Sequence, residues 1–170
     1  MKTILLFIVL IFSGLSIYAQ QIQKPGEELR NLNGDLVLFS DVLKTGHPAV
    51  LVFWKSGSSK CCENIETMQS AWLSTLKNEG VNFIAICEDC AGSWSHVKPI
   101  VMAKDWDFEV YIDPNGDFKR AMGVTTIPTT ILFDAGMKLL CRHPGWCTGN
   151  EDLLCTKIIA HLEASKNALH

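Results

Sequence analysis

Apolar residues in this chain follow two kinds of pattern, continuous runs and helical repeats. Two runs, 48–54 and 81–86, are apolar at nearly every position, which is typical of strands covered on both faces of a sheet. Between them, a Gly-Ser-Ser turn at 57–59 precedes apolar residues at helical spacing: Ile65, Met68, Trp72 and Leu76. This part of the chain is predicted to form a strand, a turn, a helix and a second strand.

The rest of the chain contains shorter elements of both kinds. Alternation of apolar and polar residues over 29–43, around an Asn-Gly-Asp turn, predicts a short hairpin or a strand with an approach loop. Further elements are expected at 94–104 (helix), 110–112 (strand), 118–122 (short helix), 129–133 with 137–141 (hairpin), 142–146 (turn) and beyond Asn150 (helix capped by Asn150). This order predicts an α/β fold of three layers, with a central mixed sheet flanked by helices.

Cysteine pairs follow both long apolar runs. Open α/β sheets place their functional sites beyond the carboxyl ends of the parallel strands. The segments expected to leave those ends are 55–62 and a loop at 87–92, and each contains two cysteines. The sequence therefore predicts a thiol site at this end of the sheet.

The first residues have the pattern of a targeting segment. Lys2 precedes a largely apolar run from Ile4 to Ile17, and the small Ala19 stands before the expected cleavage point. The run is shorter than the ~20 residues that span a bilayer. We therefore expect a signal peptide at 1–19, one domain over 20–170, export to the periplasm or beyond the cell, and no integral membrane segment after cleavage.

Composition excludes several classes of protein. Of the 170 residues, 48% are hydrophobic, and fifteen Lys and Arg face eighteen Asp and Glu, so the formal net charge is −3. A nucleic-acid-binding domain needs clustered positive charge, and this chain has three arginines, so nucleic acid is not expected as a partner. Disorder needs low hydrophobicity and high net charge, so the chain is expected to be globular.

All seven cysteines follow the predicted signal peptide, and export would deliver them to an oxidising compartment. An odd number leaves at least one thiol without an internal partner. The cysteines are therefore interpreted either as structural disulfides with a leftover thiol or as redox chemistry.

Several motifs in chain order resemble thioredoxin-like proteins of the exported TlpA-like branch, over nearly all of the chain after residue 19. The motifs are Leu36-x-Leu38-x-Ser40-Asp41, Val50–Trp54, Asp113–Gly116, Gly123–Thr129 and Asp134-x-Gly136. The resemblance implies a thioredoxin-like fold and thiol-disulfide oxidoreductase activity on protein thiols or disulfides, with no cofactor. It also implies a cis peptide bond at Pro128, with Ile127 and Pro128 contacting the bound substrate chain.

The family's active site is Cys-x-x-Cys, and this chain departs from it. Counted from the Phe53-Trp54 strand, Ser58 stands at the first cysteine and Lys60 before the second. The second thiol is Cys61, and it has gained a neighbour, Cys62. This departure leaves open a redox-inactive binding module for a partner protein, which would use the groove beside Pro128.

Cys61 and Cys62 are the candidate catalytic residues. Their position in the first turn of a helix, next to Lys60, predicts lowered pKa values for both thiols. The residues do not decide which one attacks: if Cys61 is buried, Cys62 attacks, and a slight rotation of the helix reverses the roles. A bond between these neighbours would close a strained eight-membered ring.

The other cysteines suggest supporting roles. Cys87 and Cys90, with two acidic residues between them, are a possible second redox pair or a small loop disulfide. Cys141, Cys147 and Cys155 are structural disulfide candidates, and a bridge from Cys155 to Cys141 or Cys147 would tie the last helix to the sheet.

A metal site is a further alternative. Cys61, Cys62, Cys87 and Cys90 offer four thiolates, and His143 offers a nitrogen ligand on the same rim. Adjacent cysteines bind one metal awkwardly and an oxidising compartment competes for thiols, so no metal is expected.

Overall fold

The two apolar runs form the central parallel strands of the molecule. Strands β3 (Ala49–Trp54) and β4 (Asn82–Cys87) pair in parallel, and every residue of both is buried. The computed structural model describes residues 27–44, 46–89, 91–146 and 149–167. Strand β4 extends one residue farther than predicted because Cys87 continues the pairing with Trp54, so Cys87 ends a strand and is not part of a loop.

Within the described residues, seven strands form one sheet in the order β2-β1-β5-β4-β3-β6-β7. Strands β3, β4 and β5 are parallel to one another, and the other pairings are antiparallel. The bounds of the remaining strands are β1 (Glu28–Arg30), β2 (Leu36–Leu38), β5 (Glu109–Ile112), β6 (Thr129–Phe133) and β7 (Leu139–Pro144). The predicted mixed sheet and the short hairpin near the start are confirmed.

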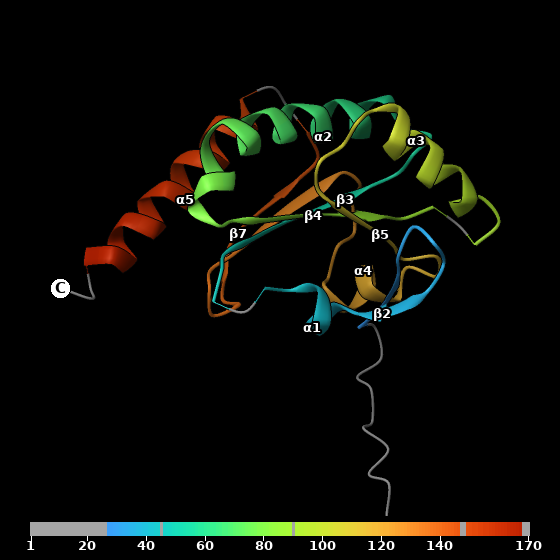
Figure 1. The fold of residues 1–170 in the computed structure, drawn as a ribbon, viewed down its shortest axis with the longest axis horizontal. Coiled ribbons are helices and arrows are strands. Elements are labelled where there is room, and N and C mark those ends of the chain that lie inside the picture. The colour runs from blue at the N-terminus through green and yellow to red at the C-terminus, as the bar shows by residue number, and fades with distance from the viewer. Residues whose placement is uncertain (1–26, 45, 90, 147–148, 168–170) are drawn as a thin grey trace, which may run out of the picture.

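Helices cover both faces of the sheet (Figure 1), so the predicted three layers are confirmed. One face is covered by α2 (Ser59–Ala71), α3 (Val97–Ala103) and α5 (Asn150–Asn167), the other by α1 (Phe39–Val42) and α4 (Asp117–Ala121). Two apolar clusters fill the spaces between the sheet and these two helical layers. Short turns of other helix types complete the chain: η1 (Trp72–Leu76), η2 (Lys77–Glu79) and η3 (Trp94–His96).

Helix α2 begins five residues after Trp54, the carboxyl end of β3. Ser58 is its N-cap, and the Ser58 Oγ accepts a hydrogen bond from the Cys61 N–H at 3.4 Å. Ile65 and Met68 are fully buried on the sheet side of the helix. This burial fixes the rotation of α2, and so determines where the two cysteines of its first turn point.

Two predicted boundaries near the C-terminus are wrong. The expected turn at 142–146 is strand as far as Pro144, because Arg142 and His143 pair with β6 and the Arg142 guanidinium donates to the Met122 and Gly123 carbonyls. Asn150 is the first residue of α5 and not its cap, because the carbonyl of the preceding Gly149 already accepts a helical hydrogen bond from the Leu153 N–H at 3.4 Å.

The predicted signal peptide, residues 1–19, lies outside the described part of the chain. No helix in the described ranges combines the length and apolarity needed to cross a bilayer.

Candidate active site

Three of the predicted thiols meet at one end of the sheet. Trp54 and Cys87 are paired at the carboxyl ends of β3 and β4, and α2 starts five residues after Trp54. Cys61 and Cys87 belong to the same buried apolar cluster, between the sheet and α2, and Cys62 packs against that cluster. The site predicted from the ends of the apolar runs is therefore assembled on the α2 face of the sheet.

Cys61 and Cys62 differ in exposure. Cys61 is 1% exposed, whereas Cys62 is partly exposed and its Sγ lies 3.9 Å from the Ser56 carbonyl oxygen, to which the thiol donates. A sulfur must be accessible to attack a disulfide in another chain. Cys62 meets this requirement and Cys61 does not.

The predicted lowering of the Cys62 pKa is wrong. Burial is the largest effect and raises this pKa, and negative charge at Cys61, Glu66 and Asp89 raises it further. The cation that lowers it is Lys104, which follows α3 and forms an ion pair with Glu66. Lys60, on which the prediction depended, is exposed to solvent.

Asp89 and Ser56 hold the segments after the two central strands together. The Asp89 Oδ1 accepts a hydrogen bond from the Ser56 N–H at 2.9 Å, and Asp89 Oδ2 accepts one from the Ser56 hydroxyl. Asp89 is 8% exposed, so this carboxylate lies within the site and not on its rim. Ser56 was not identified as a site residue from the sequence. Its position in the segment between Trp54 and α2 was the one signal that could have found it.

Cys87 lies beside this carboxylate. Burial is the main cause that raises the Cys87 pKa above its ordinary value, followed by the charge of Asp89. The main-chain N–H groups of Asp89 and Ser56 act in the other direction and lower this pKa. The prediction that neighbouring acid raises this pKa is confirmed for Asp89, whereas Cys90 lies outside the described residues.

Glu88 points to the opposite face of the sheet. Its Oε2 is 3.6 Å from Lys119 Nζ, and its Oε1 is buried with no hydrogen-bond partner in the described structure. Burial and the charge of Asp113 raise the pKa of Glu88 to about 8, and Lys119 acts in the other direction. This carboxyl is therefore separate from the thiols, although it is adjacent to Asp89 in sequence.

The Ile127–Pro128 loop lies at the same end of the sheet. The peptide bond between these residues is cis, as the resemblance implied. Strand β6 starts immediately afterwards, with Thr129 opposite Phe53 of β3, and the Pro128 carbonyl accepts a hydrogen bond from the Gly145 N–H at 2.7 Å. Pro128 is buried and Ile127 half-buried, so Ile127 is the more accessible of the two predicted substrate-binding residues.

The C-terminal cysteines are only partly placed. Cys141 is a half-buried residue of β7 with a free thiol, so the structure contains no bridge between Cys141 and Cys155. The strand holds Cys141 opposite Leu132. Cys147 lies outside the described residues, and the bridge from Cys155 to Cys147 stays a prediction.

The metal alternative gains no support from the placed ligands. Among the described residues, no group of three or more His, Cys, Asp and Glu side chains is arranged to hold a metal ion. His143 is on β7, and strands β3 and β6 separate β7 from the Cys87 strand. His143, opposite Thr130, thus lies toward the predicted end of the sheet but two strands away from Cys87.

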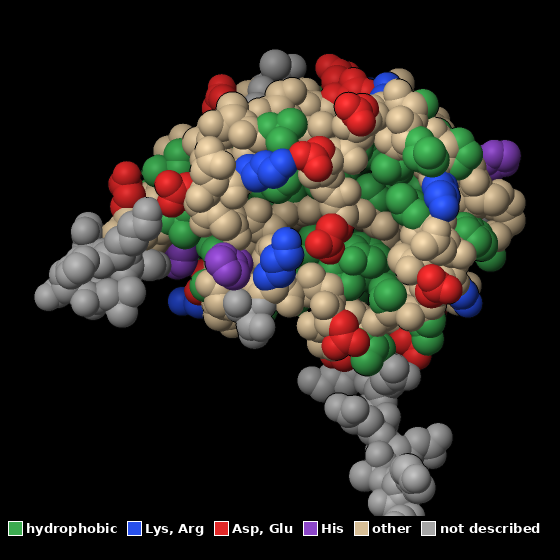
Figure 2. Space-filling view, viewed as in Figure 1, with side chains coloured by type: hydrophobic (Ala, Val, Ile, Leu, Met, Phe, Trp, Pro, Cys, Tyr) green, Lys and Arg blue, Asp and Glu red, His purple; other side chains and the backbone are tan. Residues whose placement is uncertain are grey.

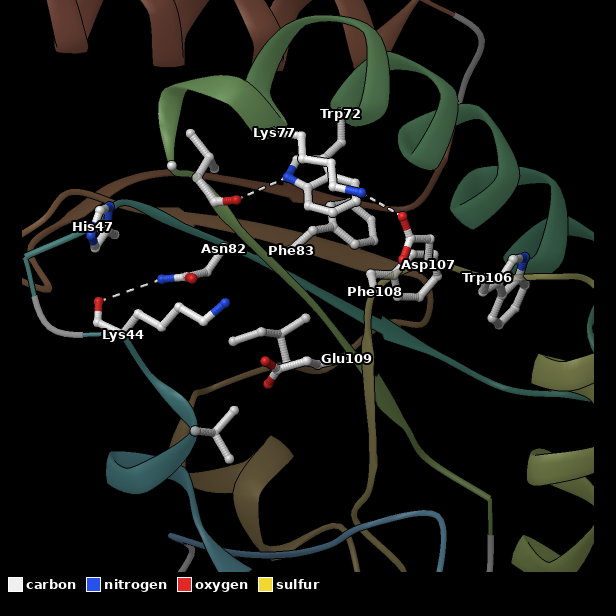
Figure 3. A pocket seen from close by; sticks show the side chains of 14 residues that line it. Lys44, His47, Trp72, Lys77, Asn82, Phe83, Trp106, Asp107, Phe108 and Glu109 are labelled. Carbon is white, nitrogen blue, oxygen red and sulfur yellow. Dashed lines mark hydrogen bonds and ion pairs between the residues drawn. The ribbon is translucent and has the colours of Figure 1, made fainter.

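A pocket of about 560 Å³ lies at the other end of the central strands. It is lined by Asn82 and Phe83 at the start of β4, whereas Cys87 ends that strand. Figure 3 shows aromatic side chains around it and charged groups at its mouth, including the Lys77–Asp107 ion pair. The pocket is therefore separate from the thiols. On the face shown in Figure 2, acidic and basic side chains are interspersed, with more acidic ones.

Comparison with known proteins identifies the family. The AhpC/TSA family model matches residues 21–142, and the chain belongs to this family. A search of curated proteins returned no match.

Solved structures give the same fold. An uncharacterized thioredoxin-like protein from Porphyromonas gingivalis is 30% identical, with a TM-score of 0.72 over 83% of this chain and 92% of that one. A putative thiol:disulfide interchange protein DsbE from Chlorobium tepidum is 27% identical, with a TM-score of 0.69 over 82% and 98%. A secreted Mycobacterium tuberculosis disulfide oxidoreductase, 17% identical over 79% and 96% with a TM-score of 0.63, shares the fold. The chain is thus a thioredoxin-like protein.

Proposed function

We propose that this protein is an exported thiol-disulfide oxidoreductase that acts on protein thiols or disulfides through Cys62. The observation that carries the proposal is a partly exposed thiol in the first turn of α2, backed by two buried thiols, at the sheet end that also holds Ile127 and Pro128. The description of the Chlorobium tepidum relative as a putative thiol:disulfide interchange protein supports the same kind of chemistry.

In this mechanism, the Cys62 thiolate attacks a sulfur of the partner's disulfide and forms a mixed disulfide, while the partner's other sulfur leaves as a thiolate. Lys104 stabilises the attacking anion because its positive charge lowers the Cys62 pKa. Ile127, at the edge of the same site, would contact the partner chain. Cys61 remains shielded behind Cys62 throughout this step.

Substitution of the two neighbouring cysteines tests the proposal. Reduction of a disulfide-bonded peptide is followed with dithiothreitol as the electron donor. The Cys62→Ser variant is expected to fall to the rate of dithiothreitol alone, and Cys61→Ser, the matched control one residue away, to keep most of its activity. Wild-type protein that is no faster than dithiothreitol alone would overturn the oxidoreductase proposal.

A second candidate, a binding module without redox chemistry, is favoured by Ser58. This residue stands where the family has its attacking sulfur, and its hydroxyl serves as the cap of α2. The two candidates differ in one outcome: a module would capture a partner through the groove beside Pro128 equally well in wild type and in Cys62→Ser.

Export is tested separately. Expression of the full chain with its first residues intact, followed by the intact mass of the protein recovered outside the cytoplasm, is expected to give a mature chain that begins at Gln20. Recovery of the full-length chain in the cytoplasm alone would contradict the signal peptide at 1–19.

A further inference from the structure

Ser56 links Cys62 to the strand end that carries Cys87. The Cys62 thiol donates to the Ser56 carbonyl oxygen, with 3.9 Å between Sγ and O, and the Ser56 N–H and hydroxyl both donate to the carboxylate of Asp89, two residues after Cys87. Both side chains lie on the α2 face of the sheet, in or against one apolar cluster. The partly exposed thiol and a buried thiol therefore belong to one site, which Ser56 and Asp89 hold together.

Cys61 is poorly suited to release a partner from Cys62. It is adjacent in sequence, and a bond between adjacent cysteines closes a strained eight-membered ring. Cys87 comes from a different element, so its bond to Cys62 would have no such ring. Cys87, at the end of β4, is therefore the second thiol that could attack a mixed disulfide on Cys62.

Asp89 supplies the base that a buried thiol needs. Burial keeps Cys87 protonated, so the thiol must lose its proton before it attacks. The Asp89 carboxylate, two residues along the chain, acts on the Cys87 pKa, and its own position is fixed by two hydrogen bonds from Ser56. The other ionisable groups that act on Cys62 are Cys61 and Glu66 on α2 and Lys104 after α3.

We propose that Cys87 is the resolving thiol for Cys62 and that Asp89 accepts its proton. This inference rests on the proposed function. With glutathione disulfide as oxidant, the Cys62 thiolate attacks one glutathione sulfur, the glutathione S–S bond breaks and one glutathione thiolate leaves. Cys87 then passes its proton to Asp89, and its thiolate attacks Cys62 Sγ. A Cys62–Cys87 bond forms, the bond to glutathione breaks, and the second glutathione leaves with the proton. Two protein thiols are oxidised and one glutathione disulfide is reduced.

The experiment adds glutathione disulfide to the reduced full chain and follows intact mass with time, with peptide mapping of the product. Wild type is expected to form a glutathione adduct that disappears, leaving a disulfide between the peptides that hold Cys62 and Cys87. In Cys87→Ser the adduct is expected to persist on Cys62, whereas Cys61→Ser and Cys90→Ser, the matched controls, resolve it.

The outcomes separate the two proposals. If neither wild type nor any of these variants forms an adduct on Cys62, the proposed function fails. If the adduct forms but Cys87→Ser resolves it as fast as wild type, or if the wild-type product links Cys87 to Cys90, only the inference is overturned. The peptide map of wild type decides this even where Cys87→Ser does not fold.

The sign of the Asp89→Asn effect separates proton acceptance from simple charge. The Asp89 charge raises the pKa of both thiols, so a purely electrostatic role predicts unchanged or faster resolution in Asp89→Asn. A purely structural role, through the two hydrogen bonds from Ser56, predicts slower resolution with an unchanged pH profile. Proton acceptance predicts slower resolution, roughly 10²-fold as for loss of a general base, and a resolution rate that keeps rising to higher pH than in wild type. Resolution that is as fast as wild type, with the same pH profile, would overturn the role of Asp89.

Discussion

Glu88 and Asp89 are adjacent carboxylates at the end of the same strand, and they serve opposite faces of the sheet. Asp89 lies on the α2 face, where Ser56 donates to both of its oxygens and where Cys87 and Cys62 are its neighbours. Glu88 lies on the α4 face, where its partners are the Lys119 cation and the Asp113 carboxylate. Both side chains are more than nine-tenths buried.

The difference shows that burial alone does not define a reactive carboxylate. Among the described residues, the Asp89 face combines a buried carboxylate with thiols, and one of these thiols, Cys62, is accessible. The cation Lys104 lowers the pKa of Cys62. The Glu88 face contains the charge cluster of Glu88, Lys119 and Asp113, with no thiol among its described contacts. We therefore assign chemistry to the first face and a pH-dependent contribution to stability to the second.

The largest expected effect contrasts the two faces in one assay. Cys62→Ser should reduce disulfide exchange with a peptide to the rate of the reducing agent alone, because the attacking sulfur is gone. Glu88→Gln should keep exchange within about twofold of wild type, since the side-chain partners of Glu88 are Lys119 and Asp113 and not the thiols. Cys141→Ser, on β7, controls for the loss of a half-buried thiol. Equal losses in Cys62→Ser and Glu88→Gln would remove the distinction between the faces.

The second effect is on stability. The unfolded chain releases the Glu88 proton near pH 4.5, whereas the folded protein holds it until about pH 8. The unfolded state therefore binds fewer protons in this range, and the free energy of unfolding falls as the pH rises, by on the order of a few kcal/mol. Glu88→Gln should lose this part of the pH dependence, as measured by urea unfolding from pH 5 to pH 9.

Asp89→Asn is the matched control for this second prediction, because it removes the adjacent carboxylate on the other face. Its unfolding free energy should still decline with pH in the way wild type does. Parallel profiles for wild type and Glu88→Gln would show that Glu88 does not ionise at a raised pKa in the folded protein.

A smaller effect concerns Lys104. The positive charge of Lys104 lowers the Cys62 pKa, so Lys104→Met should leave less Cys62 thiolate at pH 8. Alkylation of Cys62 should then slow by a few-fold, since a shift of one pKa unit changes the thiolate fraction about tenfold. Lys98→Met, on the neighbouring helix α3, provides the control and should alkylate Cys62 at the wild-type rate. Identical rates in the two variants would remove Lys104 from the site.

The smallest effect is expected for Lys119. Because the pKa of Glu88 is raised to about 8, most of this carboxyl is uncharged at pH 7, and Lys119→Met should change the unfolding free energy by about 1 kcal/mol or less. At pH 9 the carboxylate is charged and the loss of its cation should destabilise the protein more. A loss that is larger at pH 7 than at pH 9 would contradict the assignment of the Glu88 pKa.

Strong patterns made the fold predictable. The continuous burial of β3 and β4 and the helical repeat of α2 follow directly from the apolar residues, and the ends of these apolar segments indicate where the thiols gather. Boundaries failed where tertiary contacts decide them. The Arg142 guanidinium donates to the carbonyls of Met122 and Gly123, which are 20 and 19 positions earlier in the chain. This contact extends β7 beyond the predicted hairpin.

Side-chain chemistry in the site was harder to predict than its location. A helix start and a nearby lysine favoured a low Cys62 pKa, but desolvation by packing against the apolar cluster dominates, and packing is not visible in local sequence. The hydrogen bonds between Ser56 and Asp89 join residues 33 positions apart, so no local pattern announces them. For the same reason, the opposite orientations of Glu88 and Asp89 follow from the placement of the strand end and not from the sequence around them.

The central claim is that Cys62 is the accessible, attacking thiol and Cys61 the shielded one. Its most direct test is brief alkylation of the reduced, native protein with a small amount of iodoacetamide over a pH series, followed by peptide masses. We predict that Cys62 is modified well before Cys61 and Cys87, and that its rate still rises above pH 9. Modification of Cys61 ahead of Cys62 in the folded protein would contradict the claim.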